Sequence, residues 1–516
     1  MVPLEGTDNV LLEKFRQDIW NKVPHFDETN TKIVNETPLV DLSQTLKECA
    51  KNVYNLNLAE SDLKVFGKLE SQLPTGSIKV RPAVHIIHDA ITSGRLRSGQ
   101  TVIEATSGNF GIALGQLSKL GLNVIALVSR RLQEGVFEEL RNENIRIMDL
   151  DMDICPAPGM KDSANDLTAR ATAVNVRSQL SQLGFDVAAF DKETPQILDL
   201  LAKQDIINLA KYLAKIYGCF CPEQYDNKLN LDVHTKVTAP EIDQQLHDQG
   251  FSLQDFGVVC TFGTGGTSGG ISRYISDKYS KKSVHVVFPQ SAQDVAGIRT
   301  KAKAEGLTLY EPPIYAGQHE VDFEQAKPLL KFFVDKGHNI GESSALALFA
   351  TMQLANYGVG NKFVVIIADG IEKYKKNLQA MSKKQTRTQV TLDEAASSHD
   401  DYDKIIWIHT QYTPKQEGIE LIAKSLGVDP SRITVPKAAT AAKLLMTQKV
   451  PDELNAELQG AKGKTLIVCM AGQTSLMAAK VLSGNGIASE SLIGGITELP
   501  EGRMRNLGEL IRQATE

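Results

Sequence analysis

Short apolar runs alternate with stretches of helical periodicity along most of the chain. The runs have the β-branched content and the length of buried strands, and the stretches between them repeat apolar residues at the spacing of one helical face. The clearest runs are TVIEA (101–105), NVIALV (123–128), GVVCTF (257–262), VHVVF (284–288), FVVIIA (363–368) and TLIVC (465–469). This alternation predicts an α/β protein built on parallel sheets.

A polar, charged stretch at 380–404, AMSKKQTRTQVTLDEAASSHDDYDK, interrupts the alternation. Falling apolar content with accumulating charge is typical of a connection between domains. We therefore predict a first region at 1–384, a linker at 385–395 and a small domain at 396–516. A further segment at about 160–215 has helical periodicity and is compatible with a lid, an interface or additional packing.

Composition and charge narrow the class of protein. The chain has 516 residues, 42% of them apolar, and a formal net charge of −6. This length predicts two or three domains, and the charge balance predicts no nucleic-acid partner. The sequence has no run of about 18 apolar residues and no signal-type N-terminus, so we expect no membrane partner and a cytoplasmic location.

The cysteines and the basic residues indicate no special site of their own. The six cysteines are scattered without a CxxC pair, which predicts neither a disulfide framework nor a bound metal. The basic run KYKKNLQAMSKKQTR, at 373–387, is interpreted as a solvated linker rather than a binding patch.

Two glycine-rich loops each lie between a predicted strand and a predicted helix. The first is EATSGNFGIALG at 104–115, and the second is GTGGTSGG at 263–270. Backbone N–H groups at a helix N-terminus are free to bind a carboxylate or a phosphate. The second loop has neither GxGxxG nor GxxxxGK[ST] spacing, so dinucleotide and P-loop interpretations lose support. The alternative for each loop is a tight turn that requires glycine.

Six motifs in one order carry a family resemblance. They are TPLVDL (37–42), KLESQLPTGSIKVRPA (68–83), EATSGNFGIALG (104–115), CPEQYDNKLNLDVHTKVTAPEI (221–242), GTGGTSGG (263–270) and GESSALALF (341–349). Together they resemble the cysteine synthase and cystathionine β-synthase family of pyridoxal-phosphate enzymes over residues 30–380. The resemblance implies fold type II, in which two α/β domains hold the cofactor in the cleft between them, and it implies a homodimer.

The resemblance also implies roles for individual residues. Lys79 matches the lysine that binds the cofactor aldehyde, and its released amine is the general base for the Cα proton of the substrate. Asn109 matches the amide that reaches the ring hydroxyl of the cofactor. The implied phosphate cup is Gly263, Thr264, Gly265, Gly266 and Thr267, and the implied substrate contacts are Thr106, Ser107, Gly108, Phe110 and Gln224.

Three positions depart from the family pattern. Val80 stands where the family usually has aspartate, and Glu223 precedes Gln224 where it has a glutamine pair. Asp369 is followed by Gly370, which lacks the usual hydroxyl. The partner of the pyridine nitrogen is therefore Asp369, one of the serines Ser343 and Ser344, or water.

The C-terminal segment carries a second resemblance. Cys469 ends a predicted strand and precedes a predicted helix whose N-terminus stabilises a thiolate or a persulfide. The Cys-x-x-Gly-x-x-Ser spacing and the later IGGI resemble a rhodanese-like sulfurtransferase domain over residues 390–516. Thr474 stands where a basic loop residue is common in such domains. The alternative is a buried cysteine at a strand end that has no chemical role.

Both resemblances concern sulfur, so we expect a pyridoxal-phosphate enzyme that replaces the β-substituent of an activated serine or alanine derivative. Lys79 removes the Cα proton, and Cys469 carries or receives sulfur. The first alternative is a diaminopropionate-type synthase that adds an amine. The second is β-elimination by a desulfhydrase or dehydratase, and a non-enzymatic alternative is a scaffold that binds a partner through its rhodanese-like domain. The direction of sulfur flow stays open.

Overall fold

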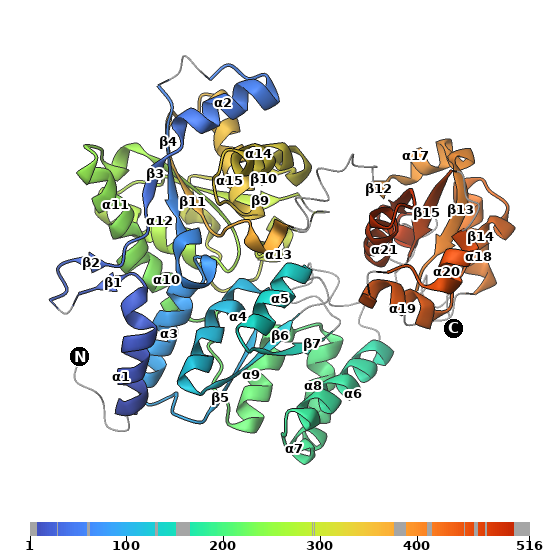
Figure 1. The fold of residues 1–516 in the computed structure, drawn as a ribbon, viewed down its shortest axis with the longest axis horizontal. Helices are drawn as coiled ribbons and strands as arrows, with labels where there is room; N and C mark the ends of the chain where they lie inside the picture. Colours follow the sequence, from blue (N-terminus) through green and yellow to red (C-terminus); the bar gives the residue numbers. More distant parts are fainter. Residues whose placement is uncertain are drawn as a thin grey trace. The chain divides into compact units, whose positions relative to one another are not determined.

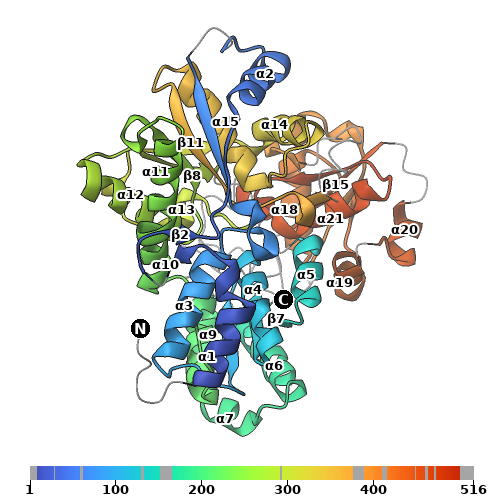
Figure 2. The same cartoon turned by 60° about the vertical axis from the view of Figure 1, so that its left-hand side comes forward.

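The chain forms two compact units, residues 1–376 and 377–516. The computed structural model describes residues 8–27, 29–58, 62–128, 133–150, 166–290, 293, 295–375, 389–409, 415–447, 449–458, 463–469 and 472–499. Figures 1 and 2 show each unit as an α/β arrangement of strands covered by helices. Among the described residues, no helix is long and apolar enough to cross a membrane.

The larger sheet of the first unit is parallel except at one edge. Its strand order is β10 (Gly317–Val321), β9 (Val284–Pro289), β8 (Gly257–Thr261), β11 (Lys362–Ile367), β4 (Lys64–Leu69) and β3 (Leu39–Asp41). Only the pair of β3 and β4 is antiparallel among these described strands. Apolar runs at 257–262, 284–288 and 363–368 thus form the strands that the sequence predicts.

Helices cover both faces of this sheet (Figures 1 and 2). On one face, Ile242 of α11 and Ile271 of α12 join Val258 and Val364 of the strands in one buried apolar cluster. The helices of this face are α10 (Lys228–Val233), α11 (Ala239–Asp248) and α12 (Gly266–Tyr279), and those of the other are α2 (Ser43–Tyr54), α14 (Phe323–Asp335) and α15 (Glu342–Asn356). Burial on both faces explains the continuous apolar strands.

A second, parallel sheet of this unit has the order β5 (Thr101–Ala105), β6 (Asn123–Val128) and β7 (Arg146–Asp149). The helices next to it in sequence are α3 (Val80–Thr92), α4 (Asn109–Leu114), α5 (Glu134–Asn142), α6 (Asp166–Gln182), α7 (Val187–Lys192), α8 (Thr194–Ala202) and α9 (Ile206–Tyr217). Val176, Phe190 and Ile197 from the extra segment pack with Ile103 and Ile125 of the sheet. The helical prediction for 160–215 is confirmed over its described residues, and these helices are part of the core.

The N-terminal helix α1 (Asn9–Asp18) packs on α3 through an aromatic contact just beyond its end. The Trp20 ring stacks on the His88 ring with centroids 4.2 Å apart and lies 4.7 Å from the His85 ring. His25 contacts the same indole at 4.8 Å. The N-terminal segment therefore packs on the helix that follows Lys79 by surrounding one indole with imidazoles.

We expect this contact to weaken in mild acid. Burial lowers the pKa of His88 to about 4 and that of His85 to about 3. The unfolded chain binds protons below its histidine pKa of about 6.5, whereas the folded chain does not, so stability falls as the pH drops from about 6.5 toward 4. His88→Gln should recover about 2 kcal/mol of the loss between pH 7 and pH 5, measured by urea unfolding. An identical pH profile in the variant would contradict this origin.

The second unit is a parallel sheet with helices. The strand order is β12 (Gln389–Val390), β16 (Ser489–Leu492), β15 (Lys464–Val468), β13 (Tyr402–Trp407) and β14 (Ile433–Thr434). Its helices are α17 (Leu392–Ser397), α18 (Gln416–Leu426), α19 (Ala438–Thr447), α20 (Asp452–Leu458) and α21 (Gln473–Gly484). The predicted linker at 385–395 is wrong from Gln389 onward, because β12 begins there and pairs with β16 inside this sheet.

Candidate active site

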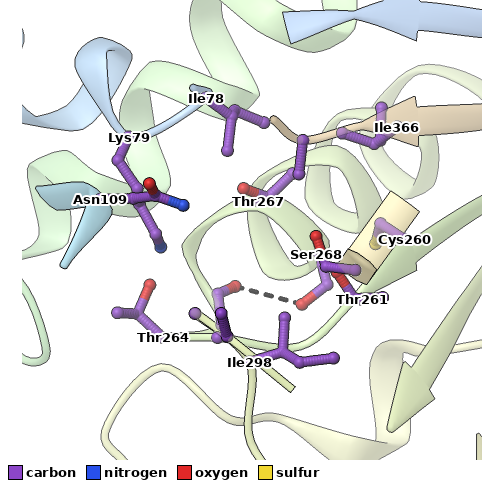
Figure 3. Close-up of a pocket in the computed structure, with 16 residues that line it drawn as sticks. Ile78, Lys79, Asn109, Cys260, Thr261, Thr264, Thr267, Ser268, Ile298 and Ile366 are labelled. Atoms are coloured by element: carbon purple, nitrogen blue, oxygen red, sulfur yellow. Dashed lines mark hydrogen bonds between the residues drawn. The ribbon is translucent and has the colours of Figure 1, made fainter. Parts of the chain in front are cut away.

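A cavity in the first unit brings together the lysine and the second glycine-rich loop (Figure 3). Its empty volume is about 530 Å³, and part of that volume is open to solvent. Its lining residues are Ile78, Lys79, Asn109, Cys260, Thr261, Gly263, Thr264, Gly265, Thr267, Ser268, Ala296, Gly297, Ile298, Ser343, Ile366 and Ala368. In Figure 3, Lys79 and Asn109 extend into the cavity from one side, toward Thr264.

Lys79 is held at the start of α3 by backbone pairing with the end of β11. Ser77 forms a β-bridge with Asp369, and Ile78 N donates to Ala368 O at 2.8 Å. Burial, with a smaller contribution from the charge of Arg299, lowers the pKa of Lys79 to about 8. The amine is thus partly neutral near neutral pH, as a nucleophile or a general base requires.

Other segments pack so closely against the second glycine-rich loop that side chains larger than glycine would not fit at Gly265 and Gly266. Gly265 has φ +94° and caps the N-terminus of α12, and a Cβ there would lie 2.4 Å from Leu309 O. A Cβ on Gly266 would lie 2.2 Å from Asn230 Oδ1, and one on Gly263 would lie 3.5 Å from Lys79 Nζ. The close packing fixes the loop at the N-terminus of a long helix, where backbone N–H groups suit a phosphate.

The two threonines of this loop are fixed from behind. Asn230 Nδ2 donates to Thr264 Oγ1 at 2.9 Å, so the Thr264 hydroxyl keeps its own hydrogen for another acceptor. Thr267 Oγ1 lies 3.2 Å from His234 Nε2, and His234 Nδ1 lies 3.0 Å from Thr238 Oγ1. Both threonine side chains therefore have set positions at the cavity wall.

The first glycine-rich loop contributes less to the cavity than the sequence predicts. Asn109 lines it, whereas Ser107, Gly108 and Phe110 do not. Thr106 is fully buried, and its Oγ1 accepts from Gly108 N at 3.1 Å and from Gly111 N at 3.0 Å. Those two N–H groups are therefore already satisfied, and the substrate roles of this loop stay predictions.

Gln224 and Glu223 lie just behind the first loop. Gln224 is 2% exposed, and its Nε2 donates to Ala105 O at 2.8 Å, so it supports the end of β5. Glu223 has φ +58° and pairs with Lys211 at 3.2 Å. The predicted substrate contact by Gln224 is not among the cavity-lining residues, and its observed bond is to the backbone.

Asp369 is held by neighbouring side chains and lies outside the lining of the cavity. Its Oδ2 accepts from Asn109 Nδ2 at 2.9 Å and from Tyr374 OH at 2.6 Å. Ser343, at the start of α15, does line the cavity, whereas Ser344 is fully buried outside it. The geometry favours Ser343 over Asp369 for the ring nitrogen.

Some residues near this site carry no signal in the sequence. Lys373 and Tyr374 are 8% and 2% exposed, so the interpretation of the basic run as solvated is wrong at its first two residues. Arg299 lies over the Tyr225 ring at 4.8 Å and adds positive charge near Lys79. No spacing signal marks these side chains, because their partners are distant in the sequence.

Gly265 offers a direct test of the phosphate site. Gly265→Ala places a methyl group against Leu309 O at a positive φ, and we expect it to weaken cofactor retention about tenfold or more, measured by dialysis and fluorescence. Gly306→Ala is the matched control, because Gly306 has φ +85° but nothing within 4 Å of an added Cβ. Equal retention in both variants would place the phosphate elsewhere.

Cys469 is positioned in the second unit at the end of β15. It is 3% exposed, and Ser475 Oγ donates to its Sγ at 3.3 Å, while Ser491 Oγ donates to Ser475 Oγ at 2.8 Å. Gly472, with φ +80°, caps α21, and a Cβ there would lie 2.5 Å from Gly494 N. The cysteine, the helix N-terminus and the IGGI segment thus meet as the sequence predicts.

Comparison with known proteins agrees with the geometry of the first unit. Residues 31–370 match the family described as pyridoxal-phosphate dependent enzyme. The chain therefore belongs to the family of pyridoxal-phosphate dependent enzymes, and the expected cofactor is confirmed. The predicted fold type II architecture of the first unit is confirmed as well.

The match with relatives of assigned activity extends over most of the length of those relatives. A cysteine synthase of Staphylococcus aureus (strain Mu50 / ATCC 700699) is 26% identical over 357 residues, 67% of this chain and 94% of the relative. An O-acetylserine dependent cystathionine beta-synthase of Bacillus subtilis (strain 168) is 26% identical over 353 residues, with 67% and 94% covered. A crystal structure of an O-ureido-L-serine-bound mutant of O-ureido-L-serine synthase matches with TM-score 0.50 and 19% identity, over 71% of this chain and 95% of that one, and shows the shared fold.

Proposed function

We propose that the protein is a pyridoxal-phosphate-dependent β-replacement enzyme that joins a sulfur nucleophile to an activated serine or alanine derivative. The observation that carries this proposal is the position of Lys79, which extends into the cavity beside the glycine loop at the start of α12 (Figure 3). The names of the relatives, cysteine synthase and O-acetylserine dependent cystathionine beta-synthase, support the reaction class.

Each cavity residue has a proposed task. Bound pyridoxal phosphate supplies an electron sink for the substrate Cα. Lys79 holds the cofactor covalently at rest and accepts the Cα proton after the substrate displaces it. The N–H group of Gly265, with the Thr264 hydroxyl, would hold the phosphate, and Ser343 would meet the ring nitrogen. The predicted N–H contact of Gly266 is directed to Thr264 Oγ1 instead.

The first glycine-rich loop has proposed contacts with both the substrate and the cofactor. The backbone of residues 106–110 holds the substrate carboxylate through N–H groups other than that of Gly108, because Gly108 N and Gly111 N donate to the Thr106 hydroxyl. Asn109 reaches the ring hydroxyl from the same loop. A homodimer and a cytoplasmic location stay predictions that accompany this proposal.

Sulfur is the favoured nucleophile for two reasons. Glu223, the carboxylate that would recognise an amine in the diaminopropionate alternative, already pairs with Lys211. In the second unit, proposed to be rhodanese-like, the sulfur of Cys469 accepts a hydrogen bond from Ser475 at the N-terminus of α21. A thiolate of Cys469 attacks the outer sulfur of a persulfide donor, the donor leaves as its thiolate, and the sulfur passes on as a persulfide.

The Cys469→Ser variant tests the sulfur step. With a persulfide donor, the wild-type protein should gain one sulfur atom on Cys469, visible by intact mass. A dithiol added afterwards with O-acetylserine reduces that sulfur to sulfide, is itself oxidised to a disulfide, and allows cysteine to form. Cys469→Ser should lose this sulfur transfer while elimination from O-acetylserine continues, because Lys79 performs it without a thiol. Cys219→Ser is the control, since Cys219 lies in the core of the first unit. Full sulfur transfer in Cys469→Ser would favour an amine nucleophile.

A further inference from the structure

A buried ammonium group lies next to the cavity without a role in the proposed chemistry. The Lys373 side chain is 6% exposed, and its Nζ donates a hydrogen bond to Asn109 Oδ1. Burial lowers the pKa of Lys373 below its usual value, which reflects the cost of keeping a charge away from water. Lys373 does not line the cavity, so its contact with Asn109 is its link to the site.

A carboxylate holds the other end of the same amide. Asn109 Nδ2 donates to Asp369 Oδ2 at 2.9 Å, and Tyr374 OH donates to that oxygen at 2.6 Å. Lys373 Nζ lies 3.9 Å from Asp369 Oδ2. The Asn109 amide therefore lies between an ammonium donor and a carboxylate acceptor, both of them buried.

These two charges permit one orientation of the amide. A flipped Asn109 would turn its NH₂ group to the ammonium of Lys373 and its carbonyl to the carboxylate of Asp369, and both contacts would be repulsive. In the observed orientation, Asp369 uses one of the two hydrogens on Nδ2. The nitrogen side of the amide, which also interacts with Tyr374, is turned toward the cavity that Asn109 lines (Figure 3). The ammonium also polarises the amide and strengthens this donor.

We propose that Lys373 and Asp369 are positioning residues that fix the Asn109 amide with an N–H directed to the ring hydroxyl of pyridoxal phosphate. This inference rests on the cofactor placement given above and on no property of the nucleophile. Gly341 belongs to the same arrangement, because a Cβ there would lie 2.1 Å from Asp369 Oδ1 and would displace the carboxylate.

The test is the absorption spectrum of the bound cofactor in Lys373→Met. Methionine has a similar length but neither charge nor donor, so Asn109 loses its fixed orientation. We expect covalent cofactor binding to persist, the ratio of the cofactor absorption bands at one pH to change, and turnover to fall about tenfold or more. Lys375→Met is the matched control, because Lys375 is exposed and pairs with Glu372 three residues away. An unchanged spectrum in Lys373→Met overturns the proposal.

A double-substitution cycle separates positioning from general stability. In an Asn109→Ala background, Lys373→Met should change neither the spectrum nor turnover further, because Lys373 acts through Asn109. Additive effects in the double variant overturn the proposal. Lys373→Gln keeps a donor without a charge, and its spectrum should lie between those of the wild type and Asn109→Ala, which gives the same test if the methionine variant is unstable. A colourless wild-type protein overturns the cofactor placement, whereas loss of sulfur transfer alone leaves this inference intact.

Discussion

Lys79→Ala protein is expected to be colourless and to lose at least about 1,000-fold in turnover, because one side chain both binds the cofactor covalently and moves the Cα proton. Absorption spectra and borohydride reduction followed by peptide mass analysis measure the covalent link. The wild-type protein should carry the reduced cofactor on the peptide that contains Lys79. Lys64→Ala is a suitable control, because the Lys64 side chain is 45% exposed on β4.

Two outcomes would contradict this assignment. Wild-type protein that stays colourless at saturating pyridoxal phosphate would remove the cofactor from the site. A reduced cofactor on Lys373 instead would exchange the roles of Lys79, which lines the cavity with Asn109, and Lys373, which donates to Asn109. Lys79 is favoured because it extends into the cavity, whereas Lys373 does not line it (Figure 3).

The largest effect on stability is expected in a buried network of four charges that lies under the start of α3. Lys68, Glu70, Arg81 and Glu241 are each 0% exposed. Arg81 Nε donates to Glu70 Oε2 at 2.6 Å, and Lys68 Nζ donates to Glu241 Oε1 at 2.5 Å. Arg81 Nη1 lies 2.7 Å from Glu241 Oε2, as an ion contact rather than an aligned hydrogen bond.

Glu241→Gln leaves this network with one uncompensated positive charge, so we expect the free energy of unfolding to fall by about 3–5 kcal/mol. Arg177→Ala is the matched control. It breaks the ion pair with Asp191, in which the side chains are 42% and 49% exposed, and should cost much less because water screens an exposed pair. Urea unfolding of the three proteins measures both values. Similar small losses in the two variants would show that the buried charges are not energetically coupled.

The sequence predicts the parts of the site that are local. The glycines at 263–266 are recognisable because a strand end and a helix start follow one another within a few residues. The same holds for Cys469, which follows β15 and precedes α21. Lys79 is recognisable only through the family motif that surrounds it. Each of these features depends on neighbours in the chain, so a pattern of residue types is sufficient to place it.

The parts that the sequence does not predict depend on distant contacts. Asn109 meets Asp369 and Lys373 across separations of 260 and 264 residues. Lys373 stands at the start of a basic run whose composition is typical of a linker, and only tertiary packing against Asn109 reveals that it is buried. The start of the second unit was missed for a similar reason, because Gln389–Val390 becomes a strand only by pairing with β16.

The strand order of the larger sheet has a consequence for folding during synthesis. β11, at Lys362–Ile367, lies between β4 and β8, so it joins one sheet fragment, β3 with β4, to another, β8 with β9 and β10. Until residue 367 has left the ribosome, β4 and β8 each have an unpaired apolar edge. The first unit therefore closes late, after nearly its whole length has been translated, and its slow step should be insertion of this central strand.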